Sequence, residues 1–262
     1  MKTDSAYSMI QTPPIPQPSP ITKTSSALFE HRAKAAELSR GTSGGPIYAL
    51  IERVIAERGL QGRILDYGAG VGQLTRRLVA LGRFASVSAT DIMAAPADLI
   101  GQAEWIEQDL NVPLPGHDGA FDVVVAAEVI EHLENPRFMI REIFRLLRPG
   151  GTAIVTTPNN ESWRSLIALL VRGHFLEFGD SGYPAHITAL LRKDLERIFR
   201  EASFIPQGFE FTNAGALPGK PSLRWQQISF GLLKGVRYSD NVLAIATKPA
   251  EGPPGECTIL FT

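Results

Sequence analysis

Four side chains that could bind a metal or move a proton stand out in the sequence. Glu128, Glu131 and His132 lie in the run E-V-I-E-H, and His186 follows much later in the chain. Two carboxylates and two imidazoles offer the mixed oxygen and nitrogen donors that Mg²⁺, Mn²⁺, Fe²⁺ or Zn²⁺ accept. Without a metal, His132 or His186 could instead act as a general base. We therefore expect these residues either to bind a divalent ion or to act directly on a substrate.

A glycine-rich segment is the second chemical feature. Residues 66–72 are D-Y-G-A-G-V-G; they follow a short apolar run and precede Leu74, Leu78 and Leu81 at helical spacing. The order of strand, loop and helix places the loop at the carboxyl end of the first strand of a parallel sheet, where ligands bind. Glycines there let the backbone turn tightly and let a ligand approach without a Cβ in the way. A tight turn without a ligand is the alternative interpretation.

The spacing of this loop favours one cofactor over another. A dinucleotide-binding loop has the pattern G-x-G-x-x-G, whereas here the third glycine comes one residue early and Gln73 holds its expected place. Asp66 would repel a pyrophosphate, but it suits the ammonium or sulfonium end of S-adenosylmethionine. On these residues the sequence resembles the class I S-adenosylmethionine-dependent methyltransferases, whose first motif matches residues 66–72 position by position. The resemblance extends over residues 64–204, most of the chain.

The resemblance implies which residues bind the cofactor. Asp66 and the loop would hold the methionine end, Asp91 would accept from both ribose hydroxyls, and Asp109 would accept from the adenine amine while Leu110 lies against the ring. Asp91 also follows the loop by about 20 residues, where nucleotide-binding folds place a ribose carboxylate; an exposed turn aspartate is the alternative. The expected cofactor-binding residues are Asp66, Gly68, Ala69, Gly70, Gly72, Asp91, Ile92, Asp109, Leu110 and Glu128.

The E-x-x-E-H run with a later histidine resembles two O-methyltransferase families. One contains the ubiquinone-pathway enzymes that act on catechol rings, and the other methylates the terminal 2′-hydroxyl of small RNAs. Both act on a hydroxyl beside a second hydroxyl, where a bound metal would lower the pKa of the attacking oxygen and orient it. The resemblance thus implies Glu131, His132 and His186 as catalytic residues and, together with Glu128, as metal ligands. In many members of the class, however, a Glu and a His at this place line the cofactor pocket without a metal.

Hydrophobic patterning predicts the scaffold that must position these groups. Residues 121–127, F-D-V-V-V-A-A, are typical of a strand buried on both faces of a parallel sheet. We expect an α/β fold: a doubly wound, mostly parallel, seven-stranded sheet with an antiparallel last strand, as in the methyltransferase class. The expected strands cover residues 63–65, 84–90, 103–108, 121–127, 152–157, 205–212 and 241–247, and the expected helices include 27–39, 46–58, 135–148 and 163–171.

One domain accounts for most of the chain. With 262 residues and 44% hydrophobic content, the chain can form one α/β domain with extra segments. We expect a disordered Pro-rich end at 1–26, a methyltransferase domain at 27–248 and a flexible tail at 249–262. Within the domain, residues 27–60 would form helices that cover the cofactor, and residues 160–184 and 213–239 would be insertions on the substrate side.

Composition argues against some partners. The formal net charge of −1 gives no global attraction to nucleic acid or anionic lipid. The single cysteine, Cys257, has no partner for an internal disulfide. We see no apolar leader and no apolar run near the ~20 residues that span a bilayer. These features favour a cytoplasmic protein that acts on a small molecule.

The segment 213–239 is basic and amphipathic. It could rest on a membrane surface through residues 220–237, or receive a phosphorylated acceptor. A helix that covers the pocket explains the same pattern. The segment contains no acid; its basic residues are Lys220, Arg224, Lys234 and Arg237, and its apolar residues at helical spacing are Trp225, Ile228, Leu232 and Val236.

Three hypotheses remain open from the sequence. The first is a small-molecule O-methyltransferase acting on a phenol, a quinone precursor or a sugar. The second is an RNA 2′-O-methyltransferase, which near-neutral charge and the lack of a recognisable RNA-binding segment weaken. The third is a protein that binds S-adenosylmethionine without transferring its methyl group. The sequence specifies neither the acceptor nor the oligomeric state.

Overall fold

The computed structural model describes Arg32 and residues 41–250. Most of the expected helix at 27–39 lies outside these residues. So do the expected disordered end at 1–26, most of the tail at 249–262, and Cys257.

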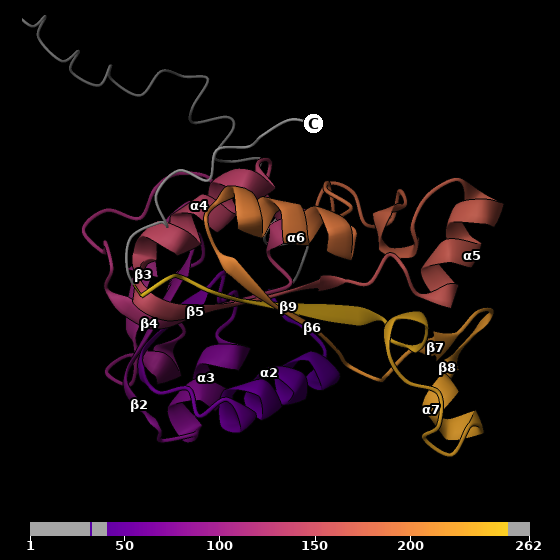
Figure 1. Ribbon diagram of the computed structural model, residues 1–262, viewed down its shortest axis with the longest axis horizontal. Helices are drawn as coiled ribbons and strands as arrows, with labels where there is room; N and C mark the ends of the chain where they lie inside the picture. The colour runs from indigo at the N-terminus through magenta and orange to yellow at the C-terminus, as the bar shows by residue number, and fades with distance from the viewer. Residues whose placement is uncertain (1–31, 33–40, 251–262) are drawn as a thin grey trace, which may run out of the picture.

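Seven strands form one sheet, in the order β3-β2-β1-β4-β5-β9-β6 (Figure 1). Strands β1 to β5 pair in parallel, and β9 runs antiparallel to both of its neighbours. The expected doubly wound sheet with an antiparallel last strand is therefore confirmed. Its strands are β1 (Gly62–Tyr67), β2 (Phe84–Asp91), β3 (Glu104–Glu107), β4 (Phe121–Ala127), β5 (Leu147–Pro158), β6 (Ile205–Phe211) and β9 (Asn241–Thr247). The strand order reverses between β1 and β4, which is where such sheets bind ligands.

Helices cover both faces of the sheet. In Figure 1, α2 (Gly45–Glu57) and α3 (Gln73–Ala80) lie below the sheet, and α4 (Pro136–Leu146) and α6 (Arg192–Glu201) lie above it. A further helix, α5 (Trp163–Arg172), stands beyond the end of the sheet. Short 3-10 turns are η1 (Ala97–Leu99), η2 (Ile130–His132), η3 (Leu176–Phe178) and η4 (Val236–Tyr238). None of the helices in the described part of the chain is long and apolar enough to cross a membrane.

Strand β4 shows why the sheet is covered on both sides. Val123 and Val125 pack into the core between the sheet and helices α2 and α3. Val124 and Ala126 pack into the core between the sheet and helices α4 and α6. Successive side chains of a strand point to opposite faces, so an apolar run without alternation needs two covers. Each fully buried valine contributes roughly 1.5–3 kcal/mol of transfer free energy. This buried strand holds the E-V-I-E-H run rigidly at its carboxyl end.

The helix expected at 135–148 ends early. Asn135 caps α4, because its Oδ1 accepts a hydrogen bond of 3.0 Å from the Phe138 N–H. The helix stops at Leu146, and β5 begins at Leu147, so the strand is longer than the expected 152–157. Pairing of Leu147 with Phe121 of β4 draws the P-G-G run into the strand. The boundary between helix and strand therefore lies just before Pro149-Gly150-Gly151, where pairing with β4 sets it.

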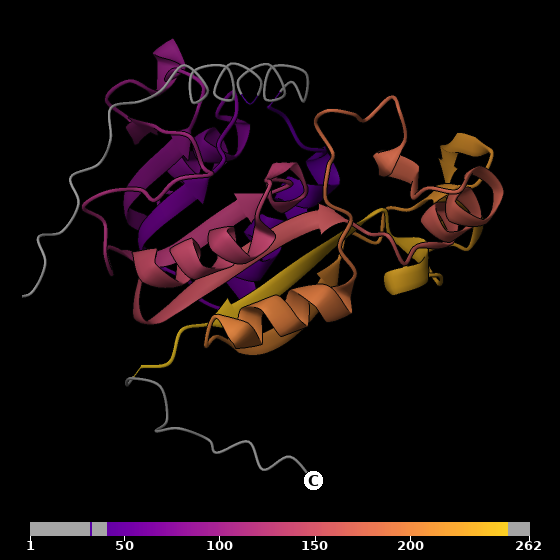
Figure 2. The same cartoon turned by 90° about the horizontal axis from the view of Figure 1, so that it is seen from above.

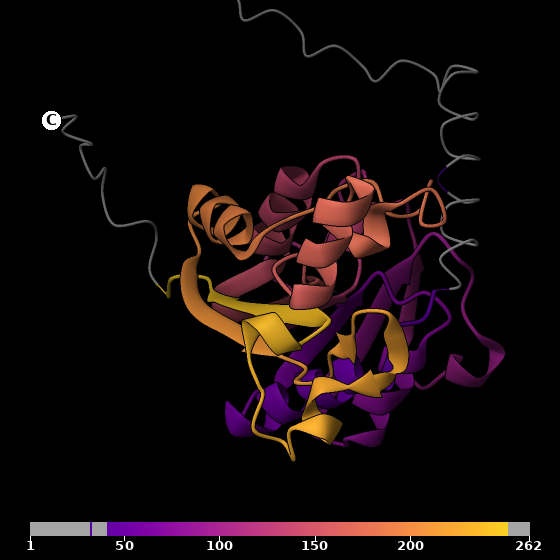
Figure 3. The same ribbon diagram turned by 90° about the vertical axis from the view of Figure 1, so that its right-hand side faces the viewer.

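The helix suggested by the apolar spacing of residues 225–236 is wrong. The segment forms a small hairpin, β7 (Ala216–Leu217) and β8 (Lys220–Arg224), and a short helix, α7 (Trp225–Ile228). Phe230 and Gly231 then take positive φ angles of 51° and 80°, the left-handed conformation that ends helices. Figures 1 and 2 show this segment and α5 together beyond one end of the sheet, and Figure 3 faces that end.

Candidate active site

The glycine loop connects β1 to α3 at the carboxyl edge of the sheet. Gly68, Gly70 and Gly72 have φ angles of 85°, 55° and 76°, which favour glycine. A Cβ on Gly70 would collide with the backbone of Gly41. Ala69, the one residue with a side chain between the first two glycines, is buried. At Gly70 the need for glycine thus comes from the chain's own packing as well as from any ligand.

Asp66 is the fully buried acid before this loop. Its Oδ2 accepts a hydrogen bond of 2.6 Å from the Thr75 hydroxyl, and its Oδ1 has no hydrogen-bond partner among the described residues. Burial raises the pKa of Asp66 to about 7; the Thr75 hydrogen bond opposes this shift and the charge of Asp91 adds to it. Buried polar atoms without partners are uncommon in proteins. The free oxygen fits a cationic group such as the ammonium or sulfonium of S-adenosylmethionine.

Asp91 ends β2 and is tied to the glycine loop. Its Oδ2 accepts from the Gly70 N–H at 2.8 Å, and its Oδ1 accepts from the Met93 N–H at 2.9 Å. Burial raises its pKa, and these backbone hydrogen bonds oppose the shift. Each oxygen has a second lone pair, which leaves Asp91 able to accept from ribose hydroxyls. Ile92, next along the chain, is half-buried.

Asp109 lies at the expected adenine end and has an unexpected partner. Its Oδ2 forms an ion pair of 2.7 Å with Arg32, and its Oδ1 accepts from the Asn111 N–H and side-chain amide. Burial raises the pKa of Asp109, but the contacts with Asn111 and Arg32 outweigh it, so the pKa is lowered. Arg32 also binds both oxygens of Glu134. Leu110 is buried in the core, with 8% of its surface exposed.

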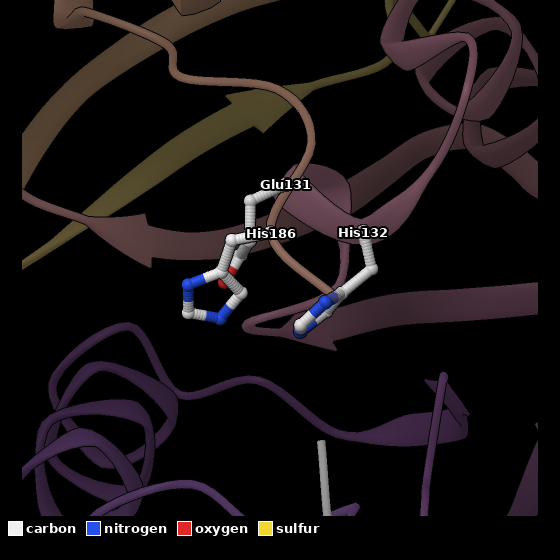
Figure 4. A group of neighbouring side chains, drawn as sticks. All are labelled: Glu131, His132 and His186. Carbon is white, nitrogen blue, oxygen red and sulfur yellow. The ribbon is translucent and has the colours of Figure 1, made fainter. Parts of the chain in front are cut away.

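Glu131, His132 and His186 come together beyond the carboxyl end of β4. Glu131 and His132 lie in η2, directly after β4, and His186 lies on the loop after η3. One ligand atom from each residue lies within 4.8 Å of the others. Figure 4 shows the three side chains pointing the same way, with the two imidazole rings side by side. This spacing suits a single divalent ion.

Both imidazoles are oriented by backbone carbonyls. Nδ1 of His132 lies 2.8 Å from the carbonyl oxygen of Ala185, and Nδ1 of His186 lies 2.8 Å from that of Glu177. A carbonyl only accepts, so Nδ1 carries the proton and Nε2 keeps its lone pair. Burial lowers the pKa of both histidines. Neutral imidazoles with a free Nε2 can bind a metal or accept a proton.

Glu131 is fully buried beside these rings. Its Oε2 accepts a hydrogen bond of 3.0 Å from the Thr157 hydroxyl, and its Oε1 has no hydrogen-bond partner among the described residues. Burial raises the pKa of Glu131 to about 8. Its backbone carbonyl accepts from the N–H groups of Ile187 and Thr188, both at 3.0 Å, which attaches the His186 loop to η2. The site thus brings together two imidazole rings and a carboxylate oxygen that has no partner among the described residues.

Glu128 stands apart from this group of three. Its backbone has a positive φ of 57°, which is uncommon for a residue with a side chain. Its Oε2 accepts from the Asn241 amide at 2.8 Å, and its buried Oε1 has no hydrogen-bond partner in the described part of the chain. Burial, and then the nearby Glu131, raise its pKa well above the usual value. The structure therefore gathers three of the four expected metal ligands, with Glu128 held toward β9.

Sequence reasoning missed the residues that orient the acids. Thr75, Thr157 and Asn241 each bind one acid of the site, and Arg32 binds Asp109. Thr157 lies in the strand expected at 152–157, to which no role in the site was assigned. The other three carry no local pattern, since their partners are distant in the sequence.

Two hollows on the described surface lie away from this edge. One, of about 470 Å³, is lined by residues that include Gly62, Phe84 and Asp122, near the amino ends of their strands. Another, of about 410 Å³, lies between the start of α4 and α6. Neither is lined by any of the expected site residues.

Comparisons with known proteins agree with this geometry. A family model described as a methyltransferase domain matches residues 35–205. The ubiquinone biosynthesis O-methyltransferase of Psychrobacter cryohalolentis is 28% identical over 163 residues, which cover 58% of this chain and 63% of that protein. The chain thus spans less than two thirds of that relative's length. The protein of the same name from Xanthomonas oryzae pv. oryzae is 32% identical over 171 residues, which cover 56% of this chain and 70% of that protein.

Solved structures show the same fold at low sequence identity. The Burkholderia thailandensis 1,6-didemethyltoxoflavin-N1-methyltransferase, solved with 1,6-didemethyltoxoflavin and S-adenosylhomocysteine, superposes with a TM-score of 0.59 and 16% identity, covering 90% of this chain and 94% of that chain. A Haloferax volcanii methyltransferase, solved in complex with the Trm112 methyltransferase activator, gives a TM-score of 0.56 and 15% identity, covering 84% of this chain and 98% of that chain. At these identities the likeness concerns the fold alone.

Proposed function

The chain belongs to the class I S-adenosylmethionine-dependent methyltransferases, and we propose that it methylates a hydroxyl oxygen of a small molecule, with a divalent ion assisting. The acceptor class we favour is a phenol or quinone precursor, and then a sugar. The observation that carries this proposal is the group formed by Glu131, His132 and His186, with their ligand atoms within 4.8 Å of one another. The curated relatives named as O-methyltransferases support oxygen as the acceptor atom.

The cofactor would bind along the carboxyl ends of β1 to β3. S-adenosylmethionine supplies an electrophilic methyl group, so the protein needs to align the acceptor and remove a proton. Asp66 offers a free buried oxygen to the cationic end. Asp91 and Asp109 offer acceptor oxygens for the ribose and the adenine amine. Glu128, at the carboxyl end of β4, would line the same pocket.

The donor set fits a hard or borderline divalent ion such as Mg²⁺ or Mn²⁺. Glu131 would provide Oε1, and His132 and His186 would each provide Nε2. When bound, the ion would lower the pKa of an acceptor hydroxyl and hold a neighbouring oxygen. Glu128 lies outside this group, with its Oε2 held by Asn241, so its Oε1 would be the atom available as a fourth ligand.

A mechanism without a metal uses the same residues. In that case Nε2 of His132 or His186 takes the hydroxyl proton, and the acceptor oxygen then attacks the methyl carbon as its bond to sulfur breaks. The two versions differ in their response to a chelator. Chelation would abolish the metal-assisted reaction and leave the reaction by a general base unchanged.

The test is methyl transfer from labelled S-adenosylmethionine to a panel of catechols, monophenols and sugars, with and without chelator. We expect transfer to a catechol, its loss with chelator and its return with Mg²⁺ or Mn²⁺. A short RNA with free terminal hydroxyls is included as an acceptor. Transfer to RNA alone would replace the small-molecule proposal, and cofactor binding with no transfer to any acceptor would favour a non-catalytic role.

We also propose that the end of the molecule formed by α5 and the β7–α7 segment contacts a membrane surface. Phe230 and Leu232 are 95% and 84% exposed, and Leu170 of α5 is 85% exposed. Residues 213–239 contain four basic residues and no acid. Exposed apolar side chains with nearby cations suit an anionic lipid surface.

Vesicle sedimentation tests this contact. We expect the protein to sediment with vesicles that contain an anionic lipid more than with neutral vesicles, and we expect Phe230→Ser with Leu232→Ser to reduce the bound fraction. A fraction that is equal on both vesicles, and equal in the variant, would exclude it.

A further inference from the structure

Two adjacent threonines at the end of β5 contact the two glutamates of the E-V-I-E-H run. Thr156 Oγ1 accepts from the backbone N–H of Glu128 at 3.0 Å, and Thr157 Oγ1 donates to Oε2 of Glu131 at 3.0 Å. Neighbouring side chains on a strand point to opposite faces. Thr156 and Thr157 can therefore form hydrogen bonds with two different residues, Glu128 and Glu131.

Thr157 is itself held rigidly. It is fully buried and pairs with Val242 of β9 in the antiparallel ladder. Its β-branched side chain has few rotamers, so the direction of its hydroxyl is well defined. Because this hydroxyl fixes Oε2 of Glu131, it also fixes the plane of the carboxylate and the direction of Oε1.

The direction of that carboxylate matters because three groups must meet. The two imidazoles are oriented by the carbonyls of Ala185 and Glu177, whereas the side chain of Glu131 receives its hydrogen bond from β5. A hydrogen bond from β5 gives Glu131 the orientation that the carbonyls give the histidines. Partners of this kind commonly tune metal affinity 10- to 100-fold.

We propose that Thr157 is a positioning residue that orients the Glu131 carboxylate toward His132 and His186. The proposal rests on the function proposed above for this group. The main-chain ladder between β5 and β9 holds the strand without the hydroxyl. Because the hydroxyl donates to Glu131 and takes no part in this ladder, we expect its removal to leave the strand pairing intact.

The test compares Thr157→Val, which removes the hydroxyl at nearly equal volume, with Thr157→Ser, which keeps it. Mn²⁺ affinity is measured by electron paramagnetic resonance, and S-adenosylhomocysteine affinity by calorimetry. We expect Thr157→Val to weaken Mn²⁺ binding about 10- to 100-fold, and Thr157→Ser to stay within a few-fold of the wild type. S-adenosylhomocysteine affinity should not change in either variant. Thr152→Val, in the middle of β5, is the matched control and should leave both affinities unchanged.

Crystal structures of both variants provide a readout that needs no metal. We expect the Glu131 carboxylate to turn in Thr157→Val and to keep its orientation in Thr157→Ser. If the wild type binds no Mn²⁺, the metal proposal is wrong, and the orientation of Glu131 alone decides the role of Thr157. An unturned carboxylate in Thr157→Val, or Mn²⁺ affinity equal to that of the wild type, would overturn the inference.

Discussion

The acids of the candidate site differ in how many of their carboxylate oxygens accept a hydrogen bond from the chain. On the cofactor side, both oxygens of Asp91 and of Asp109 accept hydrogen bonds from the chain. Glu131, which we propose acts on the acceptor, and Glu128, which we expect to line the cofactor pocket, each keep one buried oxygen without a partner among the described residues. Asp91 and Asp109 are therefore held by the chain through both oxygens, whereas Glu128 and Glu131 each have one oxygen left for a ligand.

Asp66 shows that the acids with an unpartnered oxygen are not confined to one part of the site. It lies on the cofactor side, yet it has a free buried oxygen and a raised pKa, as Glu131 has. Leaving a buried carboxylate unpaired costs stability unless a cation or proton arrives. The free oxygens thus mark two places for positive charge: the sulfonium or ammonium of the cofactor, and a divalent ion or a proton at the acceptor.

The largest expected effect comes from removing an imidazole of the acceptor side. His132→Ala or His186→Ala should lower methyl transfer by about 10²- to 10⁴-fold, because each removes a ligand or base at the reacting hydroxyl. S-adenosylhomocysteine affinity should change little, and calorimetry beside the activity assay separates the two effects. His117→Ala, which removes a ring stacked on Phe121, is the control. A loss of cofactor affinity equal to the loss of activity would place the histidines in the cofactor pocket.

The next effect tests the scaffold of the cofactor side. Gly70→Ala should lower the free energy of unfolding by about 3–5 kcal/mol, because it adds a collision with Gly41 to the strain of a positive φ. Gly82→Ala also has a positive φ but meets no atom within 4 Å, so it should cost only about 1–2 kcal/mol. Denaturant unfolding measures both. Equal costs would mean that the contact with Gly41 adds nothing.

The charge at Asp66 predicts a pH dependence. Its pKa in the folded, cofactor-free protein is about 7, above the ordinary value of 3.8. Between these values the folded state binds more protons than the unfolded state, so its contribution makes stability fall as pH rises toward 7. Ionised Asp66 should bind the cation better, so cofactor affinity should rise between pH 6 and pH 8 by about tenfold at most.

Asp66→Asn is the variant that isolates this effect. It should remove most of the rise in cofactor affinity with pH and flatten the stability curve below pH 7. Calorimetric titrations at three pH values provide the measurement. The same slope in the wild type and the variant would assign the pH dependence to another group.

The smallest effect concerns Arg32. Its pair with Asp109 is partly exposed, with 21% of the Arg32 side chain accessible, so the pair is worth about 0.2–1 kcal/mol. Arg32→Ala should therefore weaken S-adenosylhomocysteine binding by about 2- to 5-fold, and high salt should produce a similar loss in the wild type. Arg77→Ala, which breaks an exposed pair with Glu52, is the control. Affinity unchanged in Arg32→Ala would mean that Asp109 needs no partner.

Local patterns predicted the positions of the strands, and the family resemblance predicted how they form one sheet. The apolar run of β4 predicted its burial on both faces, and the glycine loop predicted a strand before it and a helix after it. The helix expected across 225–236 failed for a physical reason. Apolar spacing cannot show that Phe230 and Gly231 take left-handed backbone angles, which depend on contacts elsewhere.

The same limit applies to the site. The types and order of Glu131, His132 and His186 could be seen in the sequence, and the structure brings the three together. Their partners could not be seen: Thr157 reaches Glu131 across 26 positions, and Asn241 reaches Glu128 across 113. Sequence patterns show residues that are neighbours along one element, whereas the orientation of an acid depends on elements that meet only in the folded chain.

The most direct test of the central claim is a crystal structure of the protein with S-adenosylhomocysteine and Mn²⁺, using the anomalous signal of manganese. The account predicts an anomalous peak bonded to Glu131, His132 and His186, beside a nucleoside that contacts Asp91 and Asp109. Nucleoside density with no manganese at these three residues would contradict the proposed metal site. Manganese bound there with no nucleoside at the glycine loop would contradict the proposed function as a whole.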